Sequence, residues 1–265
     1  MLQSMPCCSH ALTELRQPPR IPTEALSALG HRGWCVIPDW LGPDAVAALR
    51  RDMQLCDQEG LPRSASIGST RTGPTAARED TQIRLSRMLP LYPPPRPSAG
   101  HIDTRMALAE AVRGLGAQLE QAEQLEDVPP LAPFHTELAY LYYPVGGMYK
   151  RHVDVPFARD GWNPMGRRPE DGGSFSGSAT RREISMLLYL DSGWETDWGG
   201  ELRIFEPDAH ADQEDSAERT VDVLPQGGTL VLMRSRRVAH EVLATRRERN
   251  CLVGWFRTVG VYVPE

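Results

Sequence analysis

The second half of the chain is a succession of short segments of strand type, and this feature constrains the fold more than any other. The segments are rich in β-branched and aromatic residues, and Gly, Pro or Asp residues separate each one from the next. They are Glu137–Tyr143, Met148–Val155, Glu183–Leu190, Glu201–Phe205, Thr229–Met233, Val238–Leu243 and Cys251–Val259. Strands of this length and spacing predict a β-sandwich or a partly closed barrel.

The first half alternates helical and extended patterns. The expected elements are a helix capped by Thr23 and running through Leu29, a strand over 34–37, a helix from Pro43 to the stop at Gly60, a short strand over 81–88, and a long helix from a cap at Asp103 to about Leu125. We therefore expect a mainly β protein with flanking helices. Residues 1–20 are predicted to be a flexible N-terminus, and residues 21–265 a single domain with its β core at about 134–259.

The segment from Pro156 to Thr180 interrupts the series of strands. It is rich in Gly, Ser, Arg and Pro and has no apolar periodicity. A connection of this length without secondary structure is uncommon inside a compact domain, and it is usually either a disordered excursion or a functional lid. Both interpretations are kept at this point.

Charge and cysteine content bear on partners and compartment. The formal net charge of −6 gives no general attraction to nucleic acid or to an anionic membrane, and no stretch approaches a membrane-spanning length of apolar residues. The five cysteines form no CxxC pair and no disulfide framework, which is typical of a reducing compartment. We therefore expect a cytoplasmic protein with no nucleic-acid or membrane partner, and no feature predicts an oligomeric state.

The strongest candidate for a chemical site is the pair His152 and Asp154. They lie two residues apart in an expected strand, so both side chains leave the same face and can reach one ion. A His or Asp on a strand is more often simply hydrogen-bonded, so the pair needs a further ligand. His240 supplies a second imidazole, and two imidazoles with one carboxylate leave coordination positions open, as a non-haem Fe(II) oxygenase requires.

A co-substrate for such a metal has its own candidate residues. Arg249 follows His240 at the start of the next expected strand, where a guanidinium can form a bidentate pair with the distal carboxylate of a 2-oxo diacid. Tyr189 and Tyr143 are candidate hydroxyl donors to the same carboxylate. Tyr142 competes with Tyr143 for the inward face, because neighbouring strand residues point to opposite sides.

Four stretches, in order, carry a resemblance to a known family. They are Tyr143-Pro144 with Gly146; Tyr149 to Asp154; Leu188 to Leu190 with Trp194 and Gly199 to Phe205; and His240 to Val242 with Arg249 and Trp255-Phe256. Over about 134–256 the chain resembles the catalytic core of the prolyl 4-hydroxylase branch of the Fe(II)/2-oxoglutarate dioxygenases, especially the hypoxia-factor prolyl hydroxylases and their bacterial relatives.

This resemblance implies a fold, cofactors and roles. The fold is a double-stranded β-helix, or jelly roll, packed on N-terminal helices. The cofactors are Fe(II), 2-oxoglutarate as co-substrate and O2, with ascorbate in support. The residues that the resemblance assigns to them are His152, Asp154 and His240 for the catalytic Fe(II), and Arg249, Tyr189 and Tyr143 for 2-oxoglutarate.

The resemblance also implies residues near the primary substrate. Arg182, seven residues before Tyr189, falls where the prolyl hydroxylases have an arginine beside the substrate. Trp255 and Tyr149 are expected in the same pocket. Arg78 and Asp80 resemble the RxD element of the mobile loop that covers the substrate in this family.

The chain departs from the family pattern at two places. Arg84 stands where the hypoxia-factor enzymes have a Trp, and the segment from Pro156 to Thr180 is longer than their connection. The first hypothesis is a hydroxylase of a prolyl residue in a protein or peptide. The second, which both departures favour, is a hydroxylase of a free amino acid or small natural product. The third is a catalytically silent β-helix protein that serves in binding.

Overall fold

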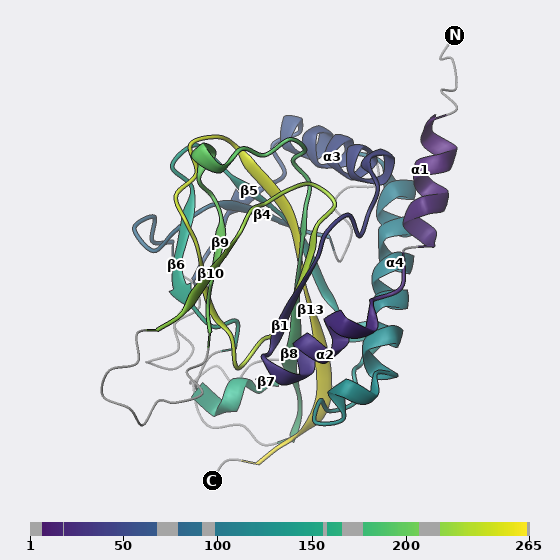
Figure 1. The fold of residues 1–265 in the computed structure, drawn as a ribbon, viewed down its shortest axis with the longest axis vertical. Coiled ribbons are helices and arrows are strands. Elements are labelled where there is room, and N and C mark those ends of the chain that lie inside the picture. The colour runs from purple at the N-terminus through teal and green to yellow at the C-terminus, as the bar shows by residue number, and fades with distance from the viewer. Residues whose placement is uncertain are drawn as a thin grey trace.

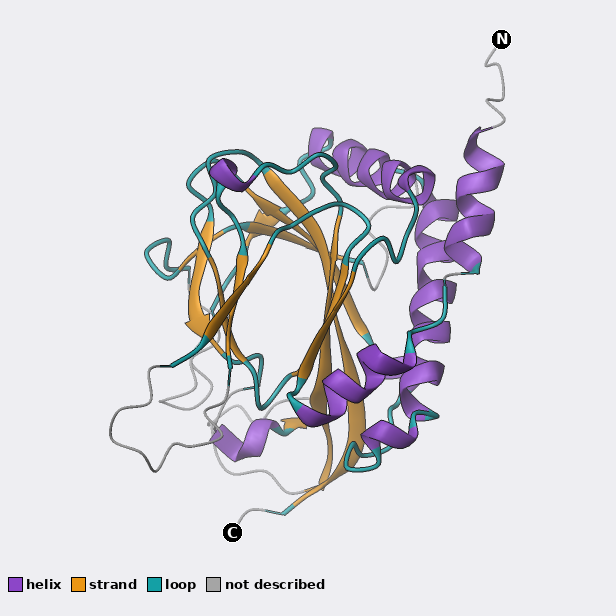
Figure 2. Ribbon diagram, viewed as in Figure 1, coloured by secondary structure: helices purple, strands orange, loops and turns teal. Residues whose placement is uncertain are grey.

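Two antiparallel β-sheets face each other in the computed structural model of the chain, and helices cover the outer face of the larger sheet (Figure 1). The structure describes residues 7–17, 19–67, 79–91, 99–155, 158–165, 177–206 and 218–263. Figure 2 shows the resulting jelly roll, mainly β with the helices to one side, as the sequence predicted. None of the described helices is long and apolar enough to cross a membrane.

The strands of each sheet come from distant parts of the chain. Across the larger sheet they are β1 (Trp34–Ile37), β11 (Leu230–Arg234), β8 (Gly177–Tyr189), β13 (Arg249–Tyr262), β5 (Glu137–Tyr143), β4 (Arg87–Pro90) and β2 (Arg63–Ser64), with β7 (Asn163–Pro164) paired to β8. Across the smaller sheet they are β10 (Thr220–Val223), β9 (Leu202–Phe205), β12 (Ala239–Val242), β6 (Met148–His152) and β3 (Arg84–Leu85). From β5 to β13 the chain passes repeatedly from one sheet to the other, which brings distant segments together between them.

The strand predictions differ from the structure chiefly at short strands, and the two-residue strands β2 and β7 were not predicted. The sequence analysis missed β10, a four-residue strand at the sheet edge whose alternating Thr-Val-Asp-Val pattern is short and largely exposed. The single strand predicted over 81–88 is divided between the two sheets. Arg84–Leu85 pairs with β6, whereas Arg87–Pro90 pairs with β5, because the chain crosses between the sheets at the buried Ser86.

The described residues form four α-helices, which lie outside the larger sheet (Figure 1). They are α1 (Cys7–Arg16), α2 (Thr23–His31), α3 (Pro43–Gln58) and α4 (Ile102–Glu120), and the short 3-10 helices are Glu123–Leu125, Pro133–His135, Ala158–Gly161 and Thr196–Trp198. Helix α3 begins at Pro43, as predicted. Asp103 lies in the first turn of α4 instead of capping it, because the helix begins one residue earlier.

Helix α1 lies within the N-terminal region that was predicted to be flexible over residues 1–20. Leu15 is fully buried in the core that the helices form with the larger sheet. Arg16 pairs with Glu110 of α4 at 3.2 Å, and Glu14 accepts a hydrogen bond from the backbone N–H of Gly42 at 2.5 Å. These contacts join segments far apart in sequence, so the local composition of residues 7–16 does not reveal them.

Part of the segment between residues 156 and 180 also belongs to the sheet. A 3-10 helix, Ala158–Gly161, leads into β7, whose Asn163 lies opposite Thr180 of β8. Strand β8 itself begins at Gly177, six residues before the predicted Glu183. The alternative of a disordered excursion therefore does not apply to residues 158–165 and 177–180, which the structure describes, whereas the alternative of a lid stays a prediction.

The larger sheet is covered on both faces, so successive residues of its strands alternate between two hydrophobic cores. In β13, Leu252 packs on the helix side, while Cys251 and Val253 pack between the sheets. In β5, Tyr142 faces the helices and Tyr143 faces the smaller sheet. The hydroxyl of Tyr142 donates a hydrogen bond to the carbonyl of Met53 at 2.8 Å. The register of β5 therefore selects Tyr143 for the interior.

A buried polar cluster joins two helices to the larger sheet. The carboxylate of Asp52 in α3 is completely buried and accepts hydrogen bonds from the hydroxyl of Tyr140 in β5, at 2.9 Å, and from the backbone N–H of His101. The Arg105 side chain of α4 lies 3.4 Å from the same carboxylate. Asp52 is the hydrogen-bond partner of the Tyr140 hydroxyl and the counter-charge of Arg105, whose Nη2 also donates a hydrogen bond to the carbonyl of Ala99.

Replacing Asp52 by Ala is expected to lower the free energy of unfolding by about 3–5 kcal/mol, because the change leaves a buried guanidinium and a buried hydroxyl without their partner. Urea unfolding followed by circular dichroism measures this difference. The matched control is Glu110→Ala, which removes an exposed carboxylate on α4 and should cost less than about 1 kcal/mol. Similar losses in the two variants would contradict the role of Asp52.

Candidate metal centre

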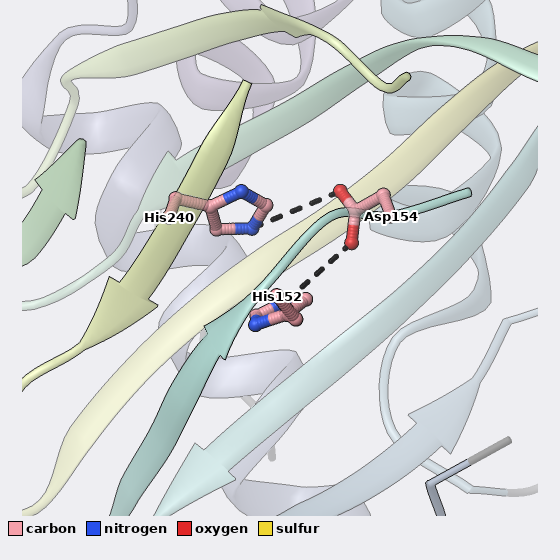
Figure 3. Close-up of side chains that lie close together, drawn as sticks. All are labelled: His152, Asp154 and His240. Carbon is pink, nitrogen blue, oxygen red and sulfur yellow. Dashed lines mark ion pairs between the residues drawn. The ribbon is translucent and has the colours of Figure 1, made fainter. Parts of the chain in front are cut away.

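Three potential metal ligands converge at the end of β6. His152 is the last residue of β6, Asp154 follows it, and His240 of β12 pairs directly opposite His152 in the antiparallel ladder. His152 Nε2 lies 3.6 Å from Asp154 Oδ1, and His240 Nε2 lies 3.9 Å from Asp154 Oδ2 (Figure 3). One ligand atom from each residue lies within 4.8 Å of the others, so a single ion can be bound by all three.

Both imidazole rings are oriented to present Nε2 to the centre. Nδ1 of His152 lies 2.8 Å from the carbonyl of Lys150, and Nδ1 of His240 lies 3.1 Å from the carbonyl of Val238. Because a carbonyl oxygen only accepts hydrogen bonds, Nδ1 carries the proton in each ring. In a neutral imidazole Nε2 then has a free lone pair, which is the form that binds a metal.

Burial and neighbouring charges favour the protonation states that a divalent metal needs. Burial, with a smaller contribution from electrostatic repulsion by His152, lowers the pKa of His240 to about 4. The imidazole of His240 is therefore neutral near pH 7. Burial acts to raise the pKa of Asp154, but the electrostatic interactions of its carboxyl group with His240 and then His152 outweigh burial and hold the pKa well below its usual range. The centre therefore combines a carboxylate with a neutral imidazole.

The carboxylate of Asp154 is also held by a serine that the sequence analysis missed. Ser185 Oγ donates a hydrogen bond to Asp154 Oδ2 at 2.6 Å and lies 2.8 Å from Ser235 Oγ. Both serines are buried. The available signal was the alternation of β8, since Ser185 lies four residues before Tyr189 and so shares its inward face.

The predicted co-substrate residues gather deeper between the sheets. Arg249, the first residue of β13, is completely buried, and its Nε donates a hydrogen bond to the carbonyl of Gly200 at 2.8 Å. Its guanidinium carbon lies 4.8 Å from the ring centre of Tyr143 and 5.1 Å from that of Tyr189. Gly200 has a positive φ of 76°, and a Cβ there would lie 3.2 Å from Arg249 Cδ. A glycine therefore suits this close approach.

Two polar groups in this region have no partner within the part of the chain that the structure describes. They are Arg249 Nη2 and the hydroxyl of Tyr189, both buried. Arg249 also makes no ion pair with a carboxylate of the described residues. Leaving a buried guanidinium without an anion is unfavourable, so the arrangement fits an anionic ligand with oxygen acceptors for both groups.

Three of the residues predicted near the substrate surround the metal triad. Tyr149 stacks on His152 with ring centres 3.6 Å apart. Arg182 donates a hydrogen bond to the backbone carbonyl of Asp154 at 3.3 Å, and its guanidinium lies 3.7 Å from the ring centre of Trp255. Tyr149 and Arg182 therefore contact the triad directly, and Trp255 is linked to it through Arg182.

Two of the residues predicted near the substrate have partners elsewhere in the protein, and a third cannot be described. Arg182 is engaged by Glu137 through hydrogen bonds of 2.9 and 2.7 Å, and the sequence analysis did not foresee this carboxylate, which also binds Arg257 at 2.7 Å. Asp80 lies in a turn, where it accepts a hydrogen bond from the backbone N–H of Gln82 at 3.1 Å. Arg78 lies outside the described residues.

Comparison with family models assigns the domain. Residues 138–257 match the model described as the 2OG-Fe(II) oxygenase superfamily. This part of the chain is a 2OG-Fe(II) oxygenase domain. Enzymes of this superfamily use Fe(II), 2-oxoglutarate and O2, and the matched range contains all three triad residues together with Tyr189 and Arg249. The match supports a dioxygenase and not a catalytically silent binding protein.

Solved structures give the same result for the fold of this oxygenase. A prolyl 4-hydroxylase from Pseudomonas putida is 27% identical, with 90% of this chain and 99% of that chain covered and a TM-score of 0.62. A prolyl hydroxylase from Trichoplax adhaerens, solved with a hypoxia-inducible-factor peptide, is 20% identical, with 96% and 94% covered and a TM-score of 0.64. A carbocyclase from nogalamycin biosynthesis is 14% identical, with 91% and 86% covered and a TM-score of 0.57. No curated protein matches the chain.

Replacing Ser185 by Ala in this oxygenase is expected to weaken Fe(II) binding by about 10–100-fold, because the hydrogen bond that orients Asp154 is lost. Anaerobic titration with Fe(II), or with redox-inert Mn(II), measures the affinity without turnover. Ser178→Ala, at an exposed position of the same strand, is the matched control and should bind as the wild type does. Equal affinities for the two variants would show that Ser185 does not orient the ligand.

Replacing Arg249 by Lys is expected to raise the KM for 2-oxoglutarate by about 10–100-fold, because a charge-assisted hydrogen bond worth about 1.5–3 kcal/mol is lost while the positive charge remains. Succinate formation at varied 2-oxoglutarate concentration measures this change. The control is Arg247→Lys, since the Arg247 guanidinium lies over the Trp198 ring at 4.0 Å and away from the interior. An unchanged KM in the Arg249 variant would contradict its role.

Proposed function

We propose that His152, Asp154 and His240 bind Fe(II), and that Arg249 binds the distal carboxylate of 2-oxoglutarate with help from hydroxyl groups. The single observation that carries this proposal is the buried, unpaired guanidinium of Arg249 beside a convergent His-Asp-His triad. The unpartnered hydroxyl of Tyr189 supports a second contact with the same carboxylate, and the interior position of Tyr143 supports a third.

The bound metal and the protein side chains have separate tasks. When bound, Fe(II) supplies the activation of O2 that couples oxidative decarboxylation of 2-oxoglutarate, to succinate and CO2, with hydroxylation of a C–H bond. Asp154 fills one ligand position as an ionised carboxylate, and Ser185 holds its orientation. Tyr149 and Trp255 line the approach with apolar surface, which excludes water from the reacting carbon. Ascorbate is expected to support turnover by keeping iron reduced.

For the group that is hydroxylated, we propose two hypotheses. The first is a prolyl ring that belongs to a protein or peptide. Support comes from the prolyl 4-hydroxylase of Pseudomonas putida, which is similar over almost its whole length. The aromatic rings of Tyr149 and Trp255 near the triad also support a prolyl target, because flat aromatic surfaces pack well against a saturated five-membered ring.

The second hypothesis, a free amino acid or small natural product, has a specific observation in its favour. Arg84 lies over the ring of Tyr149 at 4.6 Å, and Tyr149 in turn stacks on His152. A cation so close to the triad is suited to a small substrate with its own negative charge.

We further propose a cytoplasmic location and no nucleic-acid or membrane partner. Cys35, Cys56 and Cys251 are buried and free, which suits a reducing compartment. The formal net charge of −6 disfavours binding to polyanions. The partner of the enzyme is then its substrate, a protein, peptide or small molecule.

The proposed activity is tested by incubating cell-lysate proteins and metabolites with the enzyme, Fe(II), ascorbate and 2-oxoglutarate. Mass spectrometry should detect one added oxygen on a proline, together with succinate. Asp154→Ala should abolish both, because the carboxylate ligand is lost, whereas Asp222→Ala, which removes a half-exposed carboxylate paired with Arg203, should leave them unchanged. Undiminished turnover in the Asp154 variant would refute its role, and oxygen on another group would refute the prolyl target.

A further inference from the structure

The region around the metal triad contains more guanidinium groups than carboxylates. The arginines there are Arg84, Arg182, Arg249 and Arg257. Apart from the ligand Asp154, the carboxylate that pairs with them is Glu137, which binds both Arg182 and Arg257. Arg249 is already assigned to the co-substrate. Arg84 is the remaining arginine of this group, and it takes part in none of these ion pairs.

The guanidinium of Arg84 is held in place by neutral groups. Its Nε donates a hydrogen bond to Ser86 Oγ at 3.0 Å, and its Nη1 lies 3.4 Å from the carbonyl oxygen of Ser66. No carboxylate of the described residues forms an ion pair with it. These contacts fix the direction of the side chain but leave its positive charge without a counter-charge, and hydrogen-bonding capacity remains at the guanidinium.

Strand pairing directs Arg84 toward the metal triad. Arg84 of β3 lies opposite Tyr149 of β6, so the two side chains share a face of the smaller sheet. The Tyr149 ring contacts the Arg84 guanidinium at 4.6 Å and the His152 ring at 3.6 Å, measured between centres. A group bound to Arg84 would therefore lie about one aromatic ring away from a metal ligand.

The field of Arg84 reaches the interior of the site. Burial raises the pKa of Tyr143 to about 12, and the positive charges of Arg84 and then Arg249 oppose that rise. Two guanidinium groups thus act on the same buried hydroxyl, whereas 2-oxoglutarate presents one carboxylate to the protein when the other binds the metal.

We propose that Arg84 binds a carboxylate of the primary substrate, and that this substrate is a small carboxylic acid of amino-acid size. The proposal rests on the proposed oxygenase function, and of the two substrate hypotheses it selects the second, the free amino acid or small natural product, over the prolyl residue of a protein or peptide. Carbon–carbon bonds are about 1.5 Å long, so the ring or chain carbons of an amino acid held at Arg84 extend past the Tyr149 ring toward His152. A prolyl residue inside a peptide has no such carboxylate, whereas free proline carries one on the ring carbon next to its nitrogen.

The test compares matched acids and amides as probes. L-Proline and L-prolinamide, followed by the other common L-amino acids and their amides, are added to enzyme with Fe(II) and 2-oxoglutarate, and succinate formation is measured. We expect at least one free acid to stimulate succinate formation about tenfold more than its amide. If no acid exceeds its amide, or if N-acetyl-L-prolinamide stimulates as well as the acids, the proposal is overturned.

The variants assign this preference to Arg84. Arg84→Gln should raise the KM for the stimulating acid about tenfold or more while leaving the KM for 2-oxoglutarate within about twofold, and Arg84→Lys should retain part of the acid preference. Arg151→Gln is the matched control, because Arg151 is exposed on β6, lies over Phe205 and pairs with Glu218. An acid KM unaffected by Arg84→Gln, or a rise only in the KM for 2-oxoglutarate, would overturn the proposal.

Calorimetric binding of the same acid to Mn(II)- and 2-oxoglutarate-loaded protein gives a readout without turnover. We expect about tenfold weaker binding of the acid to the Arg84→Gln protein than to the Arg151→Gln protein. Normal binding of 2-oxoglutarate by both variants shows that they are folded. Wild-type protein that binds neither metal nor 2-oxoglutarate would instead overturn the proposed function, and the carboxylate site with it.

Discussion

The antiparallel pairing of β12 with β6 places His240 directly opposite His152, and the rest of the site depends on this register. A slip of one residue would turn one imidazole to the outer face of the sheet, because strand side chains alternate. A β-bulge between His240 and Val242 shifts the pairing, so that Val242 lies opposite Tyr149. The same two strands thereby hold the candidate metal ligands and the aromatic ring that stacks on one of them.

The interior between the sheets is locally positive in a chain whose formal net charge is −6. Arg249 is completely buried, and Arg84 reaches the same region from the edge of the smaller sheet. Such burial is unfavourable unless anions arrive to pair with the cations. The space between the two sheets is therefore suited to bind carboxylates, and the metal triad lies at one end of it. The helices that cover the larger sheet stabilise the sheet from outside.

Much of the site followed from local sequence patterns. The two-residue spacing of His152 and Asp154, and the position of Arg249 after His240, depend only on strand alternation and chain order. The choice between Tyr142 and Tyr143 did not, because both lie in one apolar strand with two buried faces. Ser185 and Glu137 were missed for a related reason, since a serine or glutamate acquires its partner only when distant strands pair.

The sequence by itself determined the strand succession, the candidate metal ligands and the helices that begin at Thr23 and Pro43, because periodicity and turn residues act over a few neighbours. Only the tertiary structure decided that α1 packs on the helical layer, that residues 81–88 divide between two sheets, and that Arg84 lies over the ring beside His152. These outcomes depend on contacts between segments far apart in the chain. A local sequence pattern does not determine the free energy of such contacts.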